Sequence, residues 1–77
     1  VLFRSRVGRL PDCGLQLGDA SVSRHHAEVR ARGEGFVVVD LGSTNGTRVN
    51  GVRIDERELR DGDEVRFGSV RVQFSAS

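Results

Sequence analysis

The pattern that most constrains the fold of this chain is an alternation of apolar and polar residues with a period of two. It occurs in "AEVRAR" from Ala27, "EVRFG" from Glu64 and "VRVQFS" from Val70. Each segment places its apolar residues on one face and Arg, Glu or Gln on the other, which predicts a half-buried antiparallel strand. "FVVVDL" from Phe36 is more continuously apolar, as expected of a strand in the middle of a sandwich. No helical period competes with these patterns, so we predict an all-β, antiparallel sandwich.

Turn-forming residues divide the chain at intervals typical of small β-sandwiches. They occur in "RGEG" from Arg32, "STNG" from Ser43, "VNG" from Val49, "RDGD" from Arg60 and "FGS" from Phe67. The segment "IDERELRD" from Ile54 has only Ile54 and Leu59 as apolar residues, so we predict a loop with one buried Leu.

Size and composition allow one domain with a small core. The chain has 77 residues, 36% of them hydrophobic, with 4 Phe and no Trp, Tyr or Met, so the core must consist of Val, Leu and Phe. The single cysteine, Cys13, excludes an internal disulfide, and no apolar run approaches the roughly 18 residues of a membrane span. We therefore expect a cytoplasmic location.

The charge balance argues against a nucleic-acid partner. Twelve basic residues face 11 acidic ones, for a net charge of +1, so the chain has no overall field that would hold a polyanion. Any anion must be bound locally. All of the basic residues are Arg, which we attribute mainly to a GC-rich bacterial genome, although guanidinium groups also suit bidentate phosphate binding.

Three short clusters carry the chemistry of the chain: "VGR" from Val7, "SVSRHHA" from Ser21 and "DLGSTNGTRVNG" from Asp40. Together with "LRDGDEVRFG" from Leu59, they resemble the signature of forkhead-associated (FHA) domains, which are β-sandwiches that recognise phosphothreonine. The resemblance extends from about Arg6 to Phe74. It implies that the chain binds a phosphothreonine-containing protein of a Ser/Thr kinase pathway, in trans or within its own parent chain, without a cofactor.

The resemblance also assigns roles to individual residues. It implies that the phosphate is bound by Arg9, Ser23, Arg24 and Thr44. This assignment agrees with the need of a phosphate dianion for fixed positive charge and neutral donors. Asn45 is expected to hold the main chain of the peptide, because its amide can both donate and accept.

A second set of residues is expected to shape the site without contacting the ligand. His26 corresponds to the structural His of the family's Ser-Arg-x-His motif, and His25 fills the variable position. Asn45-Gly46 is expected to form the recognition loop and Asn50-Gly51 the next hairpin turn. The predicted structural residues are Gly8, His26, Gly46, Asn50 and Gly51.

The N-terminus departs from the family pattern. Such domains begin with one or two additional strands before the Gly-Arg turn, whereas this sequence has only about seven residues there, so we expect a sandwich that lacks its first one or two strands. "VLFRS" fits no local pattern, and we interpret residues 1–5 as a possible non-native leader before an FHA domain at residues 6–77.

Other kinds of function find less support. The adjacent His25 and His26 point to opposite faces of a strand, so we predict no metal site. Ser23 or Ser43 with His26 and Asp40 could resemble a hydrolase triad, but there is no nucleophile elbow, and we predict that the chain is not an enzyme. The main alternative to phosphothreonine recognition is a phospho-independent protein-interaction sandwich.

Overall fold

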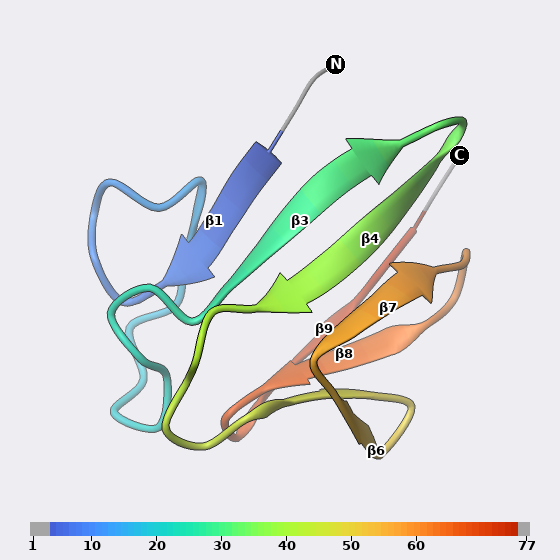
Figure 1. The fold of residues 1–77 in the computed structure, drawn as a ribbon. Helices are drawn as coiled ribbons and strands as arrows, with labels where there is room; N and C mark the ends of the chain where they lie inside the picture. Colours follow the sequence, from blue (N-terminus) through green and yellow to red (C-terminus); the bar gives the residue numbers. More distant parts are fainter. Residues whose placement is uncertain (1–3, 76–77) are drawn as a thin grey trace.

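The computed structural model describes residues 4–75, which form two packed β-sheets (Figure 1). The larger sheet has the strand order β2-β1-β3-β4-β7 and the smaller sheet the order β6-β5-β8-β9. The strands are β1 (Arg4–Gly8), β2 (Leu15–Gln16), β3 (Ala27–Arg32), β4 (Gly35–Asp40), β5 (Thr47–Val49), β6 (Val52–Ile54), β7 (Glu56–Leu59), β8 (Glu64–Phe67) and β9 (Val70–Gln73). The described pairs are antiparallel except β1 with β2, which run parallel. Among residues 4–75 there is no helix that is long and apolar enough to cross a membrane.

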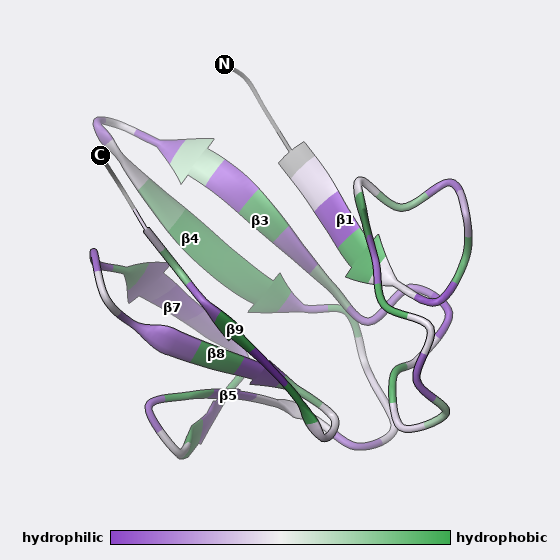
Figure 2. Ribbon diagram, turned by 180° about the vertical axis from the view of Figure 1, so that it is seen from behind, coloured by the Kyte–Doolittle hydropathy of each residue, from purple (hydrophilic) through white to green (hydrophobic). Residues whose placement is uncertain are grey.

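The core lies between the sheets and is made mainly of valines. Val7, Val38 and Val49 are at most 1% exposed, and they pack with Leu59 and Phe67 in one cluster. Hydrophilic and hydrophobic residues alternate along β8 (Figure 2), and Val65 and Phe67 are buried, as the period of two predicts. The predicted central strand is confirmed, because β4 lies between β3 and β7.

The prediction of a loop after Ile54 was wrong. Glu56–Leu59 form strand β7, which pairs with β4 through Val38 opposite Arg57 and Phe36 opposite Leu59. Three of its four residues are exposed and charged, as is common in an edge strand, so the sequence pattern resembles that of a loop. The expected burial of Leu59 is confirmed at 6% exposure.

The N-terminal part of the chain joins the large sheet. Val1 to Phe3, which belong to the suggested leader, lie outside the described residues, whereas Arg4 and Ser5 pair with Arg30 and Val29 as part of β1. An apolar depression of about 160 Å³ lies beside β9, between side chains of the two sheets that include Val29, Leu59 and Val72.

The topology brings the three sequence clusters to one end of the sandwich. Val7 of β1 pairs with Ala27 of β3, which in turn pairs with Asp40 of β4. The turn after β1, the loop before β3 and the loop after β4 therefore start from neighbouring positions and meet at the same end (Figure 1).

Candidate phosphate-binding site

The first two clusters are held together by backbone hydrogen bonds. The N–H of Arg9 donates to the carbonyl of Ser23 at 3.2 Å, and the N–H of His26 donates to the carbonyl of Val7 at 2.8 Å. A Cβ atom at Gly8 would lie 2.0 Å from the carbonyl oxygen of Arg24. Glycine at position 8 therefore permits the close approach that places Arg9 beside Ser23.

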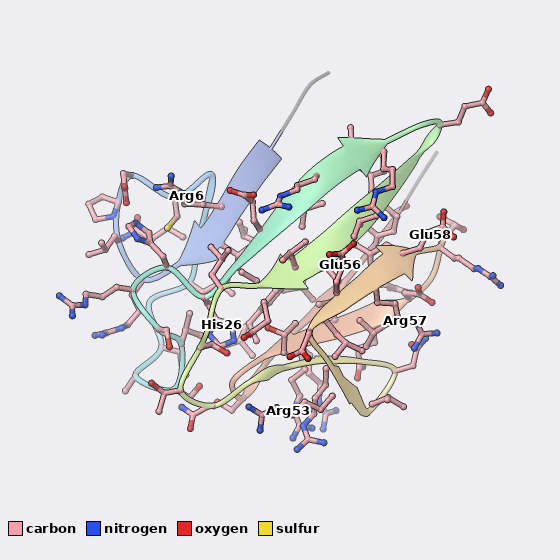
Figure 3. The ribbon with its side chains drawn as sticks, in the orientation of Figure 1. Arg6, His26, Arg53, Glu56, Arg57 and Glu58 are labelled. Carbon is pink, nitrogen blue, oxygen red and sulfur yellow. The ribbon has the colours of Figure 1, made fainter. Side chains whose placement is uncertain are left out.

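His26 links the second cluster to the third from inside the protein. Its ring, labelled in Figure 3, is fully buried at 0% exposure. It packs edge-on against Phe67, with the ring centroids 5.7 Å apart. Nδ1 accepts a hydrogen bond from the N–H of Ser23 at 3.1 Å, so Nε2 carries the proton and donates to the carbonyl of Gly46 at 2.8 Å. One imidazole thus sets the distance between the two loops.

The four predicted phosphate-binding residues border one surface depression. Its volume is about 550 Å³, and it is lined by Arg9, Ser23, Arg24 and Thr44 together with Leu10, His25 and Gly42. The N–H of Thr44 donates to Ser23 Oγ at 3.1 Å across the two loops. Residues that are up to 35 positions apart in sequence, Arg9 and Thr44, therefore face the same space.

The Arg9 side chain is oriented by one strong contact. Its Nε donates to the carbonyl of Val22 at 2.7 Å, which uses one of the five N–H donors of the guanidinium group. The Arg24 side chain is exposed at the rim of the same depression. Two positive charges therefore border a depression whose lining contains no carboxylate.

Asp40, at the end of β4, organises the recognition loop. Its carboxylate accepts from Ser43 Oγ at 2.5 Å and from Thr47 Oγ1 at 2.7 Å, and also from the N–H groups of Gly42 and Ser43. Burial alone would raise the pKa of Asp40, but these hydrogen bonds outweigh it and hold the pKa below the ordinary value of 3.8. Ser43 Oγ in turn accepts from the N–H of Gly46 at 3.0 Å.

The two Asn-Gly pairs have different conformations. Asn50 and Gly51 have φ of +51° and +84° and join β5 to β6 as a two-residue hairpin turn. In the first pair only Gly46 has a positive φ, +85°. Its carbonyl accepts from His26 Nε2, and its N–H donates to Ser43 Oγ. Asn45 instead uses its Nδ2 to donate to the carbonyl of Ser21 at 2.8 Å.

The support for that Asn45 contact comes from residues that no sequence motif indicates. Ser21 is held by Asp19, whose Oδ1 accepts from the Ser21 N–H at 2.9 Å and from its Oγ at 2.6 Å. These bonds lower the pKa of Asp19. Gly68 packs against the same residue, since a Cβ there would lie 2.4 Å from the Ser21 carbonyl oxygen. The "FGS" signal predicted a turn but not that this turn contacts Ser21.

Cys13, the single cysteine of the chain, is buried. It is 7% exposed, its Sγ lies 3.5 Å from the Arg24 carbonyl oxygen, and burial raises the pKa of its thiol. Donor atoms of Asp12, Cys13 and His25 lie within 4.8 Å of one another, a combination that the sequence analysis did not consider. Asp12 pairs with His25 at 3.3 Å and with Arg6 at 3.8 Å, which fixes His25 at the edge of the depression.

The loops at one end of this β-sandwich present arginines and hydroxyl groups around one depression, as expected of a domain that binds a phosphorylated ligand. The family model for the FHA domain matches residues 5–68, and the chain belongs to this family, whose members bind phosphothreonine peptides.

Relatives and solved structures agree with this assignment. The chain is 51% identical over 68 residues to the glycogen accumulation regulator GarA of Mycolicibacterium smegmatis, covering 88% of this chain and 43% of that protein. It is 46% identical to the oxoglutarate dehydrogenase inhibitor of Corynebacterium jeikeium, over 88% of this chain and 47% of that protein. The chain thus spans less than half of the length of these relatives.

Two solved structures have closely similar folds. A structure from an analysis of phosphothreonine-dependent FHA domain interactions matches with a TM-score of 0.92 and 38% identity, over 96% of this chain and 77% of that one. Mycobacterium tuberculosis EmbR in complex with a low-affinity phosphopeptide matches with a TM-score of 0.89 and 40% identity, over 94% of this chain and 19% of that one.

Proposed function

We propose that this chain binds phosphothreonine in an extended peptide, with Arg9, Ser23, Arg24 and Thr44 as the phosphate ligands. The observation that carries this proposal is that all four residues line the same depression. Two guanidinium groups balance a phosphate dianion and can each donate more than one hydrogen bond to it. Because Ser23 Oγ accepts from the Thr44 N–H, its own O–H remains able to donate to a phosphate oxygen.

Asn45 is the proposed contact to the peptide main chain. Its Nδ2 bond to the Ser21 carbonyl uses one of its two amide protons and fixes the orientation of the side chain. The other proton and the Oδ1 atom can then pair with a peptide N–H and C=O, much as a neighbouring strand would.

We also propose that the chain acts by binding alone and not by catalysis. Both ring nitrogens of His26 are bonded to backbone groups of Ser23 and Gly46, so this His is not placed to take a proton from Ser23 Oγ. The carboxylate of Asp40, the third member of the suggested triad, is occupied by Ser43 and Thr47.

The proposed partner is a substrate of a Ser/Thr protein kinase, either a separate protein or another part of the parent chain. The single cysteine supports a cytoplasmic location for this interaction, because it excludes an internal disulfide. The regulatory activities named for the relatives belong to longer proteins, of which this chain matches less than half.

The test is binding to a matched set of peptides that carry phosphothreonine, phosphoserine or unmodified threonine at one position. We expect phosphothreonine to bind most tightly. Phosphoserine should bind about fivefold more weakly, since burial of one methyl group is worth about 1 kcal/mol. The unmodified peptide should not bind measurably. Equal affinity for the unmodified peptide would instead support a phospho-independent interaction domain.

A further inference from the structure

Four arginines form a continuous row on the outer face of the small sheet. The strand register places Arg48 of β5 opposite both Arg53 of β6 and Arg66 of β8, and it places Arg66 opposite Arg71 of β9. Directly opposed residues lie side by side on one face of a sheet, so the row crosses all four strands, over about 14 Å from first to last. Nitrogen-tipped side chains gather around Arg53 beneath the small sheet in Figure 3.

The row points away from the core. The neighbours of Arg48 along β5, Thr47 and Val49, are 0% exposed, and those of Arg66 along β8, Val65 and Phe67, are 4% and 2% exposed. Because side chains alternate between the two faces of a strand, the arginines between these residues face solvent. Arg53 and Arg71 are exposed, and Arg48 and Arg66 are half-buried.

Within the protein, this row is electrostatically unfavourable. Like charges directly opposite each other destabilise a sheet, and the row contains three such pairs in succession. The ion pairs found among residues 4–75 use Arg6, His25, Arg30 and Arg32, all on the large sheet or its loops. Within the row, Arg48 and Arg66 donate only long bonds to the carbonyls of Gly51 and Gly68, at 3.5 and 3.4 Å.

The row is continuous with the recognition loop. A Cβ atom at Gly46 would lie 3.0 Å from the guanidinium group of Arg53, so this side chain packs directly against the residue that follows Asn45. A protein bound at the loop can therefore extend over the row. Among the residues of β5, β6, β8 and β9, the one acidic side chain is Glu64, and it lies at the opposite end of β8 from the recognition loop.

We propose that this arginine row is a second binding surface, separate from the phosphate site, for an acidic segment of a protein partner. This inference depends on the proposed function in one respect only: it assumes that the bound partner is a protein. Guanidinium groups pair with carboxylates in bidentate geometry, so a row of Asp or Glu side chains supplies the charge that the sheet lacks. Nucleic acid is a poorer match. The net charge of the chain is only +1, and no aromatic residue of β5, β6, β8 or β9 faces outward to stack on bases.

The test uses a fluorescent 12-residue peptide rich in Glu, with a Gln-substituted copy as its control. We compare the unmodified chain with the double variant Arg48→Gln/Arg66→Gln. The matched variant Arg57→Gln/Arg60→Gln removes the same charge from exposed positions outside the row. We expect the row variant to lose about tenfold in affinity for the Glu peptide. The matched variant should lose less than about twofold, and the Gln peptide should not bind.

Two further measurements make the result decisive. Thermal unfolding of the row variant should occur at the same or a higher temperature, because like-charge repulsion is removed. Affinity for the phosphothreonine peptide should be nearly unchanged in the row variant. This measurement distinguishes a defect in the phosphate site from a loss of binding at the arginine row. Equal loss in both double variants would overturn the proposal. Tighter binding of a random DNA oligonucleotide or of anionic lipid vesicles than of the Glu peptide would overturn it as well.

Discussion

At the scale of single residues, the site depends on side chains that act at its edge and on one that acts from inside. Arg9 and Arg24 border the depression, whereas His26 contributes only by holding the Ser23 and Gly46 backbones at a fixed separation. Loss of an edge residue should therefore mainly weaken phosphopeptide binding, whereas loss of His26 should mainly lower the free energy of unfolding.

Replacement of Arg9 by Ala should weaken phosphothreonine binding by about 2 kcal/mol, or roughly 30-fold, because one charge-assisted contact to the phosphate is lost. The free energy of unfolding should fall by only about 1 kcal/mol, because the exposed Arg9 side chain donates one hydrogen bond, to the carbonyl of Val22. Isothermal titration calorimetry with the phosphothreonine peptide measures the effect, and Arg57→Ala serves as a control for charge. Unchanged affinity in Arg9→Ala would contradict the assignment of Arg9 to the phosphate.

Replacement of His26 by Ala should destabilise the whole domain by about 3 kcal/mol. The change leaves a cavity and removes the partners of the Ser23 N–H and the Gly46 carbonyl. Urea unfolding monitored by circular dichroism measures the loss. His25→Ala, at the neighbouring half-buried position, should cost less than about 1 kcal/mol. Equal effects of the two substitutions would argue against the linking role of His26.

At the scale of elements, two turns that are distant in sequence are joined by one side chain. Asn50 Nδ2 donates to Asp63 Oδ1 at 2.9 Å, and Asn50 Oδ1 accepts from the N–H of Glu64 at 3.0 Å. The hairpin turn between β5 and β6 is therefore attached to the turn before β8. The Asn-Gly signal predicts the hairpin turn but carries no information about this attachment.

This attachment can be tested with Asn50→Gly. Glycine adopts a positive φ more readily than Asn, so a simple turn would tolerate the substitution. Because two hydrogen bonds are lost, we expect destabilisation by about 1 to 2 kcal/mol in urea unfolding. Gly51→Ala, which strains the same turn without touching the bonds of Asn50, provides the comparison. A stability equal to that of the unmodified chain would show that the side-chain bonds of Asn50 do not contribute.

At the scale of the whole molecule, stability should decline in acid. Asp19, Asp40 and Asp63 all have lowered pKa values in the folded state, chiefly because their carboxylates accept hydrogen bonds. A group whose folded pKa is lowered stabilises the protein above its unfolded pKa. That contribution is lost as the pH falls through the folded pKa. We expect the free energy of unfolding to decrease as the pH falls below about 4.

Asp40→Asn should reduce this dependence. The variant should be less stable at neutral pH, because Asn donates where the carboxylate accepts from Ser43 and Thr47. Its free energy of unfolding should also change less between about pH 5 and pH 2. Urea titrations at a series of pH values give both quantities. An unaltered pH slope would show that Asp40 does not contribute to the acid sensitivity.

Several strands, one turn and the family could be predicted from the sequence, because each depends on a local pattern of residues. The period of two predicted the buried face of β8, and Asn50-Gly51 predicted a hairpin turn. In β3 the predicted alternation was wrong, because Glu28 is buried next to Ala27 whereas Ala31 is exposed. The order of the three clusters identified the family. Strand β7 was missed because an edge strand with exposed charges has the same local pattern as a loop.

Only the tertiary structure decided which distant residues meet. The bonds of His26 to Ser23 and Gly46, the burial of Cys13 and the arginine row all depend on strand register and on the packing of loops against one another. The alternating strands follow from local sequence, because the pleat places successive side chains on opposite faces of any strand. It did not determine their register, since each pairing depends on segments far along the chain and on the shared burial of a single core.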